Sequence, residues 1–224
     1  MGEGVHVLHS PRAREVVRIA APSVGERLAH TLSLLVYFRV LSAFGPMAVA
    51  TYTVGVRMLS FSWIPGTAFG VAASTLVGHA LGGGSPGDAA RAGWRATRLA
   101  LVVALGMSLV ALQLPETLAQ LFTTDPTLIE GLIPFLILMA LAQPVLQSHF
   151  ALAGSLRGAG DTWTPFVVST LTTWGLRVPL AASVAWLQGP VVWVWLAILV
   201  DHAVRASWLA LAFRRGRWKQ AIAR

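Results

Sequence analysis

Residues 127–156 read TLIEGLIPFLILMALAQPVLQSHFALAGSL, and this stretch decides the fold. Its only Asp, Glu, Lys or Arg is Glu130, close to the amino end. A helix of about 20 mostly apolar residues is long enough to cross the hydrocarbon core of a bilayer. Asp125 and Pro126, just before the stretch, suit the cap and the first turn of a helix. The stretch therefore predicts a membrane-spanning helix.

Five further apolar stretches lie on either side of this one. Glycine and proline interrupt the chain between them, at residues 45–46, 82–84, 115 and 164–165. The sequence thus predicts an all-α integral membrane protein, a bundle of six transmembrane helices. The predicted spans are residues 22–44, 47–81, 96–114, 127–156, 165–187 and 190–213. Residues 1–21 are predicted to form a basic amphipathic lead-in, and residues 214–224 a basic tail.

Positive charge is sorted between the turns of the predicted bundle. Turns 44–47, 114–127 and 187–190 contain no Lys or Arg. The other turns and both ends carry Arg12, Arg14, Arg18, Arg91, Arg95, Arg98, Arg157, Arg214, Arg215, Arg217, Lys219 and Arg224. Cytoplasmic connections of membrane proteins are enriched in Lys and Arg. The pattern predicts a multi-pass protein of the cell membrane, with the lipid bilayer around it and both termini in the cytoplasm.

Composition excludes several other classes of protein. Hydrophobic residues make up 55% of the chain and charged residues 12%, against roughly 25% charged in an average soluble domain. The net charge of +8 comes from basic residues that flank apolar segments, so nucleic-acid binding is not predicted. The chain has no cysteine for a disulfide or a thiolate metal site. No nucleophile–base pair, metal-ligand cluster or phosphate loop stands out, so we predict no enzyme, no metal and no cofactor.

Polar side chains within the first predicted span share one face. Glu26, His30, Ser33 and Tyr37 follow one another at offsets of four, seven and eleven residues from Glu26. Polar groups inside a membrane usually face the bundle interior or a cavity. Glu26 therefore has two readings: a carboxylate that exchanges a proton or a cation, or the partner of Arg27 or of another helix. His30 fits a packing residue better than a metal ligand.

The fourth span carries a pair of amides, Gln143 and Gln147, one helical turn apart. Such a pair can hydrogen-bond a substrate or hold neighbouring helices together, and the second role is favoured.

Three charged residues of the last two spans are expected to form a structural network. Asp201 and Arg205 stand four residues apart and can pair on one helix face, and Arg177 is expected to reach the same cluster. In the turn between spans four and five, Arg157 is expected to bridge to Asp161. Local sequence offers no partner for Arg39 or Arg57.

Several stretches with the same order and spacing form a set: residues 18–22 with Glu26, 70–82, 121–126, the hairpin LRGAGDTWTP at 156–165, 177–181, 192–197 and 213–219. Taken together, they resemble the multidrug and toxic compound extrusion (MATE) family of transporters. Members of this family have twelve helices in two six-helix lobes. The arginine-rich ending and the stretch RVPLA at 177–181 resemble the second, C-terminal lobe only. His79 stands where the family often has glutamine.

The resemblance implies a secondary active efflux transporter, or one lobe of it. The activity would be antiport of small organic, often cationic, compounds against Na⁺ or H⁺. Glu26 is then the candidate for ion or proton coupling, and Tyr37, Gln143 and Gln147 are candidates for the substrate cavity. A separate N-terminal lobe or a homodimer is needed for a full pathway. Two alternatives stay open: a truncated or split-gene lobe that does not transport, and a protein resembling a lipid-linked oligosaccharide flippase.

Overall fold

The computed structural model describes residues 11–220, with side chains for residues 20–219. Residues 1–10 of the predicted lead-in and 221–224 of the predicted tail lie outside this part. Within it the chain is helical and has no strand. The elements are α2 (Pro11–Ser42), α3 (Pro46–Gly82), α4 (Pro86–Gln113), α5 (Pro115–Gln120), α6 (Pro126–Gly158), α7 (Trp163–Thr172), η1 (Thr173–Arg177), α8 (Val178–Trp186), α9 (Val192–Arg215) and η2 (Arg217–Gln220).

The helices extend beyond the apolar stretches that predicted them. α2 already begins at Pro11 and continues through Pro22, where the lead-in was expected to give way to the first span. α4 begins at Pro86, where Ser85 and Pro86 favour a helix start, and leads into the predicted membrane span at residues 96–114. The predicted turn 114–127 contains the short helix α5. Hydropathy marks the part of a helix that suits lipid, whereas backbone hydrogen bonding continues into polar residues at the membrane surface.

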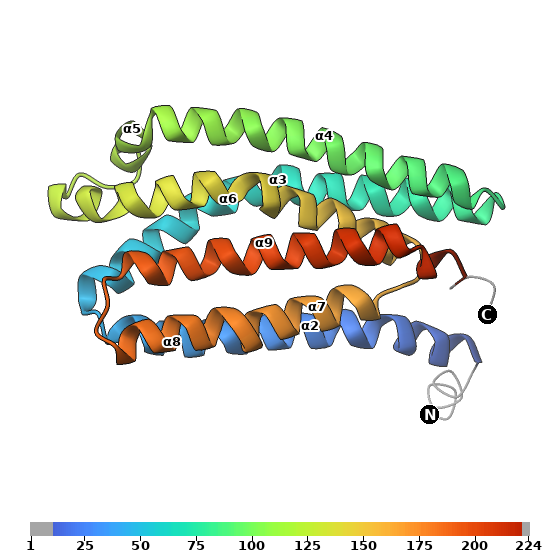
Figure 1. The fold of residues 1–224 in the computed structure, drawn as a ribbon, viewed down its shortest axis with the longest axis horizontal. Coiled ribbons are helices and arrows are strands. Elements are labelled where there is room, and N and C mark those ends of the chain that lie inside the picture. Colours follow the sequence, from blue (N-terminus) through green and yellow to red (C-terminus); the bar gives the residue numbers. More distant parts are fainter. Residues whose placement is uncertain (1–10, 221–224) are drawn as a thin grey trace, which may run out of the picture.

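Four helices are long and apolar enough by themselves to cross a membrane, namely α3, α4, α6 and α9. α2 carries more polar and charged side chains than these four. The fifth predicted span is divided into α7, η1 and α8, each of them short. α2 and the combined segment of α7, η1 and α8 nevertheless run between the same two ends of the bundle as the other helices (Figure 1).

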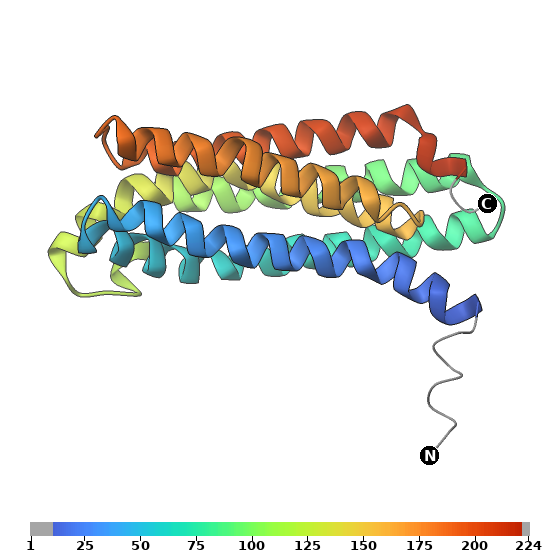
Figure 2. The same ribbon diagram turned by 90° about the horizontal axis from the view of Figure 1, so that it is seen from below.

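The bundle has two unequal parts. α3, α4 and α6 pack together, with α9 against α6. α2 lies beside α7 and α8 on the opposite side of α9, and both views show this layer (Figures 1 and 2). α3 and α6 make the most extensive contact because glycines let their backbones meet. A Cβ on Gly154 would overlap the backbone of Gly70, and one on Gly158 the backbone of Ser74.

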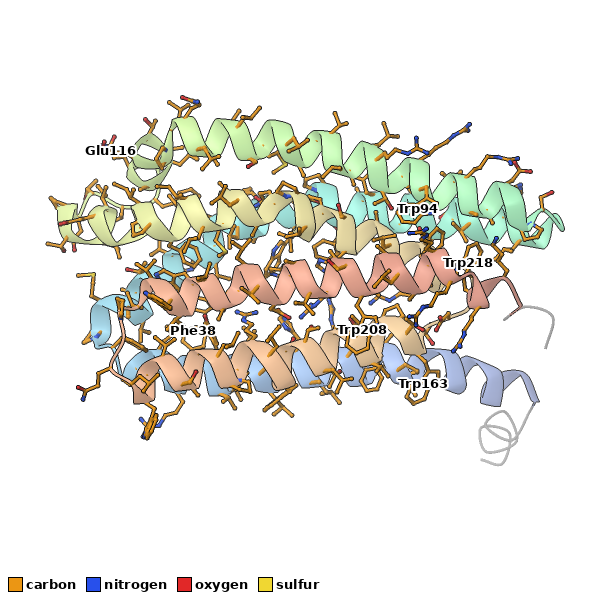
Figure 3. All side chains as sticks on the ribbon, viewed as in Figure 1. Phe38, Trp94, Glu116, Trp163, Trp208 and Trp218 are labelled. Atoms are coloured by element: carbon orange, nitrogen blue, oxygen red, sulfur yellow. The ribbon has the colours of Figure 1, made fainter. Side chains whose placement is uncertain are left out.

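The connections are sorted to the two ends as the charge pattern predicts. The α2–α3 turn, α5 and the α8–α9 turn gather at one end, and the α3–α4 and α6–α7 turns at the other, with both described chain ends (Figure 1). Trp94 and Trp218 lie toward this second end, opposite Glu116 (Figure 3). Phe213 stacks on Trp218 with ring centroids 4.7 Å apart, and the Trp218 indole donates to the Phe213 carbonyl at 2.7 Å. This contact closes the carboxyl end of α9.

Candidate functional site

A small cavity of about 70 Å³ lies inside the bundle, between α2, α3, α6, η1 and α9. Its polar lining comes from four helical segments: His30 on α2, Tyr52 on α3, Arg177 on η1 and His202 on α9. The rest of the wall is mostly aliphatic and aromatic. The polar residues of four segments that are far apart in sequence therefore converge on one interior point.

A π-helical turn places Arg177 at this cavity. Pro179 has no N–H to donate and its ring crowds the carbonyl of the preceding turn, so it disturbs the regular α-helical hydrogen bonding there. The chain widens instead, and the Val178 N–H bonds to the Thr173 carbonyl. Arg177 is 8% exposed and donates from Nη2 to the Tyr52 hydroxyl at 3.1 Å. Its Nε has no hydrogen-bond partner.

Tyr37 lies beneath Arg177 and does not line the cavity. The guanidinium carbon sits 4.5 Å from the centre of the Tyr37 ring, a cation–π arrangement. The Tyr37 hydroxyl donates to the Val194 carbonyl at 2.9 Å, and the side chain is 1% exposed. The expectation of a cavity-wall residue on α2 is therefore wrong for Tyr37 in this structure. Its aromatic ring is large enough to reach across to α9, and it joins the hydrophobic core there.

Asp201 and Arg205 form an ion pair on one face of α9. Arg205 Nη2 lies 3.1 and 3.0 Å from the two carboxylate oxygens of Asp201. The guanidinium also donates to the hydroxyls of Thr172 and Thr173, at 3.2 and 2.7 Å. Asp201 is fully buried. These contacts neutralise both charges and attach α9 to the start of the π-helical turn.

Arg177 does not pair with this carboxylate, contrary to the sequence expectation. Among the described side chains, Arg177 makes no ion pair within 4.0 Å. Asp201 is already occupied by Arg205 from its own helix, whereas the two tyrosines hold the Arg177 guanidinium. A buried cation thus remains beside a neutral pair.

Glu26 is engaged in a clamp between three helices. Its Oε2 lies 2.6 Å from Arg157 Nη2 at the end of α6, and its Oε1 accepts from the Ser169 hydroxyl of α7 at 2.8 Å. The Trp174 indole adds a bond to the Ala29 carbonyl at 3.1 Å. Of the two readings of Glu26, the structure shows the pairing with another helix. The carboxylate is not open to the cavity.

The expected bridge between Arg157 and Asp161 does not form. Asp161 instead accepts from the backbone N–H of Thr164 at 2.9 Å and from its hydroxyl at 2.6 Å. It therefore organises the first turn of α7. Proximity in the sequence suggested that Arg157 pairs with Asp161, but the hairpin turns the Arg157 side chain toward α2, where Glu26 lies.

The two glutamines have different surroundings. Gln147 is fully buried, and its amide donates to the Ser62 carbonyl of α3 at 2.6 Å and to Gln143 at 3.4 Å. Gln143 lines a second, larger groove of about 680 Å³ between α3, α4, α5 and α6. Apolar side chains make up most of that groove. Gln147 therefore links helices, whereas Gln143, itself only 3% exposed, lies at the wall of the groove.

Arg39 and Arg57 take no part in either volume. Arg39 makes a long contact of 3.5 Å to the Ser42 hydroxyl, and Arg57 is exposed on α3.

Sequence reasoning missed Tyr52, Ser169 and His202 as members of these clusters. Each stands among other polar residues of its helix, Ser169 beside Thr170 and His202 beside Asp201, so the local pattern did not single it out. Only a rule that collects all intramembrane polar groups could have found them.

A family model described as MatE matches residues 22–182. The chain belongs to the MatE family. It is 28% identical over 212 residues to a probable multidrug resistance protein NorM of Thermotoga maritima, covering 92% of this chain and 45% of that protein. It is 30% identical over 211 residues to a probable NorM of Brucella suis, with the same coverage. This MatE chain thus spans about half the length of the curated relatives it matches.

The fold of this chain likewise matches about half of a solved MATE structure. The crystal structure of the eukaryotic MATE transporter AtDTX14 superposes with a TM-score of 0.83 at 22% identity. The match covers 94% of this chain and 48% of that one. The six-helix bundle is therefore the fold of about half of a MATE transporter.

Proposed function

We propose that this chain forms one lobe of a secondary active efflux transporter, which exchanges small organic, often cationic, compounds for Na⁺ or H⁺. One observation carries the proposal: a nearly complete match of this chain accounts for about half of each relative and of the solved structure. Transporter folds built from two repeats bind substrate between them and alternate access by moving one against the other. A second six-helix lobe is needed, whether from the same polypeptide, a separate chain or a second copy.

The clamp at Glu26 suggests how a coupling ion could act in this lobe. A cation or proton at Glu26 would compete with Arg157 for the same carboxylate, which lies only 2.6 Å from the guanidinium. Loss of that pair would free α2 from the end of α6. An ion shifts a conformational equilibrium only by binding one state better than the other. We therefore retain Glu26 as the coupling candidate, and Gln143 as the one for the substrate cavity.

Reconstitution tests the proposal. The chain is placed in proteoliposomes, alone and together with the N-terminal lobe of a MatE relative, and the flux of a fluorescent organic cation is followed under an imposed Na⁺ or pH gradient. We expect gradient-dependent flux when a complete pair of lobes is present. Folded and assembled lobes that show no such flux would instead identify a non-transporting lobe. Gradient-independent movement of a lipid-linked sugar would favour the flippase alternative, which the buried positive charge of Arg177 supports.

A matched pair of glutamate variants tests the role of Glu26. Glu26→Gln keeps the size of the side chain and removes its charge, so coupled flux is expected to disappear while membrane insertion persists. Glu116→Gln makes the same change on the exposed helix α5, at the other end of the bundle, and should leave flux unchanged (Figure 3). Coupled flux retained by the Glu26 variant would exclude this role.

A further inference from the structure

The inner cavity carries an uncompensated positive charge. Asp201 and Arg205 neutralise each other, and Glu26 pairs with Arg157. Arg177 is buried at 8% exposure with only neutral tyrosines as partners. Burying a charge is costly unless an opposite charge or a full set of hydrogen bonds accompanies it. The described residues supply neither to Arg177.

The free hydrogen-bonding capacity around the cavity consists mainly of donors. Arg177 Nε–H has no acceptor. Tyr52 accepts from Arg177, and its own O–H proton has no acceptor among the described residues. The buried His202 Nδ1 is also unpartnered and donates in one tautomer of the neutral ring. The described lining contains no carboxylate that could attract a cation.

We propose that this cavity binds a small monovalent inorganic anion of the size of chloride, held by Arg177, Tyr52 and His202. The volume of about 70 Å³ fits, because a water molecule takes up about 30 Å³ and the space accommodates a small ion with one water. His30 lines the cavity and is exposed on α2, so it marks the entrance. The remaining wall is mostly apolar and strengthens the attraction between ion and guanidinium.

The bound anion has a structural consequence that does not depend on transport. It bridges the π-helical turn to α3 and α9, at the point where the fifth span departs from regular α-helix. A ligand that binds only the folded state stabilises it by RT ln(1 + [L]/Kd), so the stabilisation grows with the concentration of the ligand. Chloride should therefore stabilise this lobe even in a preparation that transports nothing.

Thermal unfolding of the purified chain in detergent tests the site. The melting temperature is measured at constant ionic strength in mixtures of sodium chloride and sodium gluconate, and again with choline replacing sodium. We expect the melting temperature to rise with chloride concentration, whichever cation is present, and not with gluconate, because gluconate is too large for the cavity. Stabilisation that follows sodium, or that is equal in gluconate, would overturn the proposal. So would stabilisation by acetate without any by chloride.

Two arginine variants localise the effect. Arg177→Gln should abolish the dependence on chloride, whereas Arg57→Gln removes the same charge from an exposed site on α3 and should retain it. Tyr52→Phe serves as a second test in case Arg177→Gln does not fold. It loses one donor and keeps the ring, and it should weaken the chloride dependence several-fold. Anomalous scattering from crystals grown in bromide gives an independent readout. A crystal grown in bromide that shows no anomalous peak beside Arg177 would exclude the site. So would a chloride response that is unchanged in both Arg177→Gln and Tyr52→Phe.

Discussion

The contact of α3 with α6 and the attachment of α2 to the bundle rest on different physics. α3 and α6 meet through glycines, so that backbone touches backbone. α2 contributes Tyr37 and Leu41 to the hydrophobic core and also makes polar bonds to other helices: Glu26 to Arg157, Tyr37 to the Val194 carbonyl, and the Ala29 carbonyl to Trp174. In a membrane, where apolar surface alone drives little helix association, close packing makes a permanent contact. Polar bonds between side chains can break and re-form without displacing backbone from backbone.

The largest expected effect comes from widening the α3–α6 contact. Gly154→Val would force side-chain atoms into the Gly70 backbone, which cannot move aside as a flexible side chain can. Overpacking typically costs about 1–3 kcal/mol, and we expect the upper part of this range or beyond because the contact is to backbone. The yield of monodisperse protein and its melting temperature in detergent measure the loss.

Gly106→Val is the matched control for that experiment. Gly106 is exposed on α4, and a Cβ there meets nothing within 4 Å. The control should fold and melt close to the unchanged chain. If both valine variants melt alike, close backbone packing is not what holds α3 to α6.

A smaller effect is expected at the Glu26 clamp. The Glu26 and Arg157 side chains are 23% and 36% exposed, so solvent screens part of their attraction. We expect a coupling free energy of about 1 kcal/mol between Glu26→Gln and Arg157→Gln in a double-mutant cycle. Denaturant unfolding in mixed micelles supplies the four free energies. In these variants, backbone hydrogen exchange should also quicken in α2 but not in α6. If the two single changes in the free energy of unfolding simply add up in the double variant, the pair contributes nothing.

The smallest effect concerns the start of α6. Asp125 accepts from the Thr127 hydroxyl at 2.6 Å and from its N–H at 2.9 Å, and these bonds lower the pKa of the carboxyl below its ordinary 3.8. A carboxyl whose pKa is lowered by folding stabilises the folded state at pH values above its pKa in the unfolded chain. This stabilisation is lost as the pH falls through its pKa in the folded protein. Asp125→Ala should therefore lower the melting temperature slightly at pH 7 and by less at pH 3. An equal difference at both pH values would contradict the assignment.

Much of the fold can be predicted from the sequence, and less of the site. The apolar stretches indicated where the long helices lie, since about 20 apolar residues in a row favour a helix that can cross a bilayer. The pair Asp201–Arg205 followed from helical spacing. The partner of Arg157 did not, because Glu26 lies 131 residues away along the chain. The π-helical turn was also missed, since Pro179 shows where regularity fails but does not show how the backbone adapts.

The sequence by itself determined that the chain is a helical membrane protein, where its long helices lie and which turns share an end. These properties depend on hydropathy, charge and helix breakers, all of which act locally along the chain. Only the tertiary structure decided that Glu26 is paired, that Tyr37 is buried and that Arg177 faces a cavity without a counter-charge. Which polar groups meet inside a bundle depends on how its helices are arranged and rotated, and many residues distant in sequence determine that arrangement together.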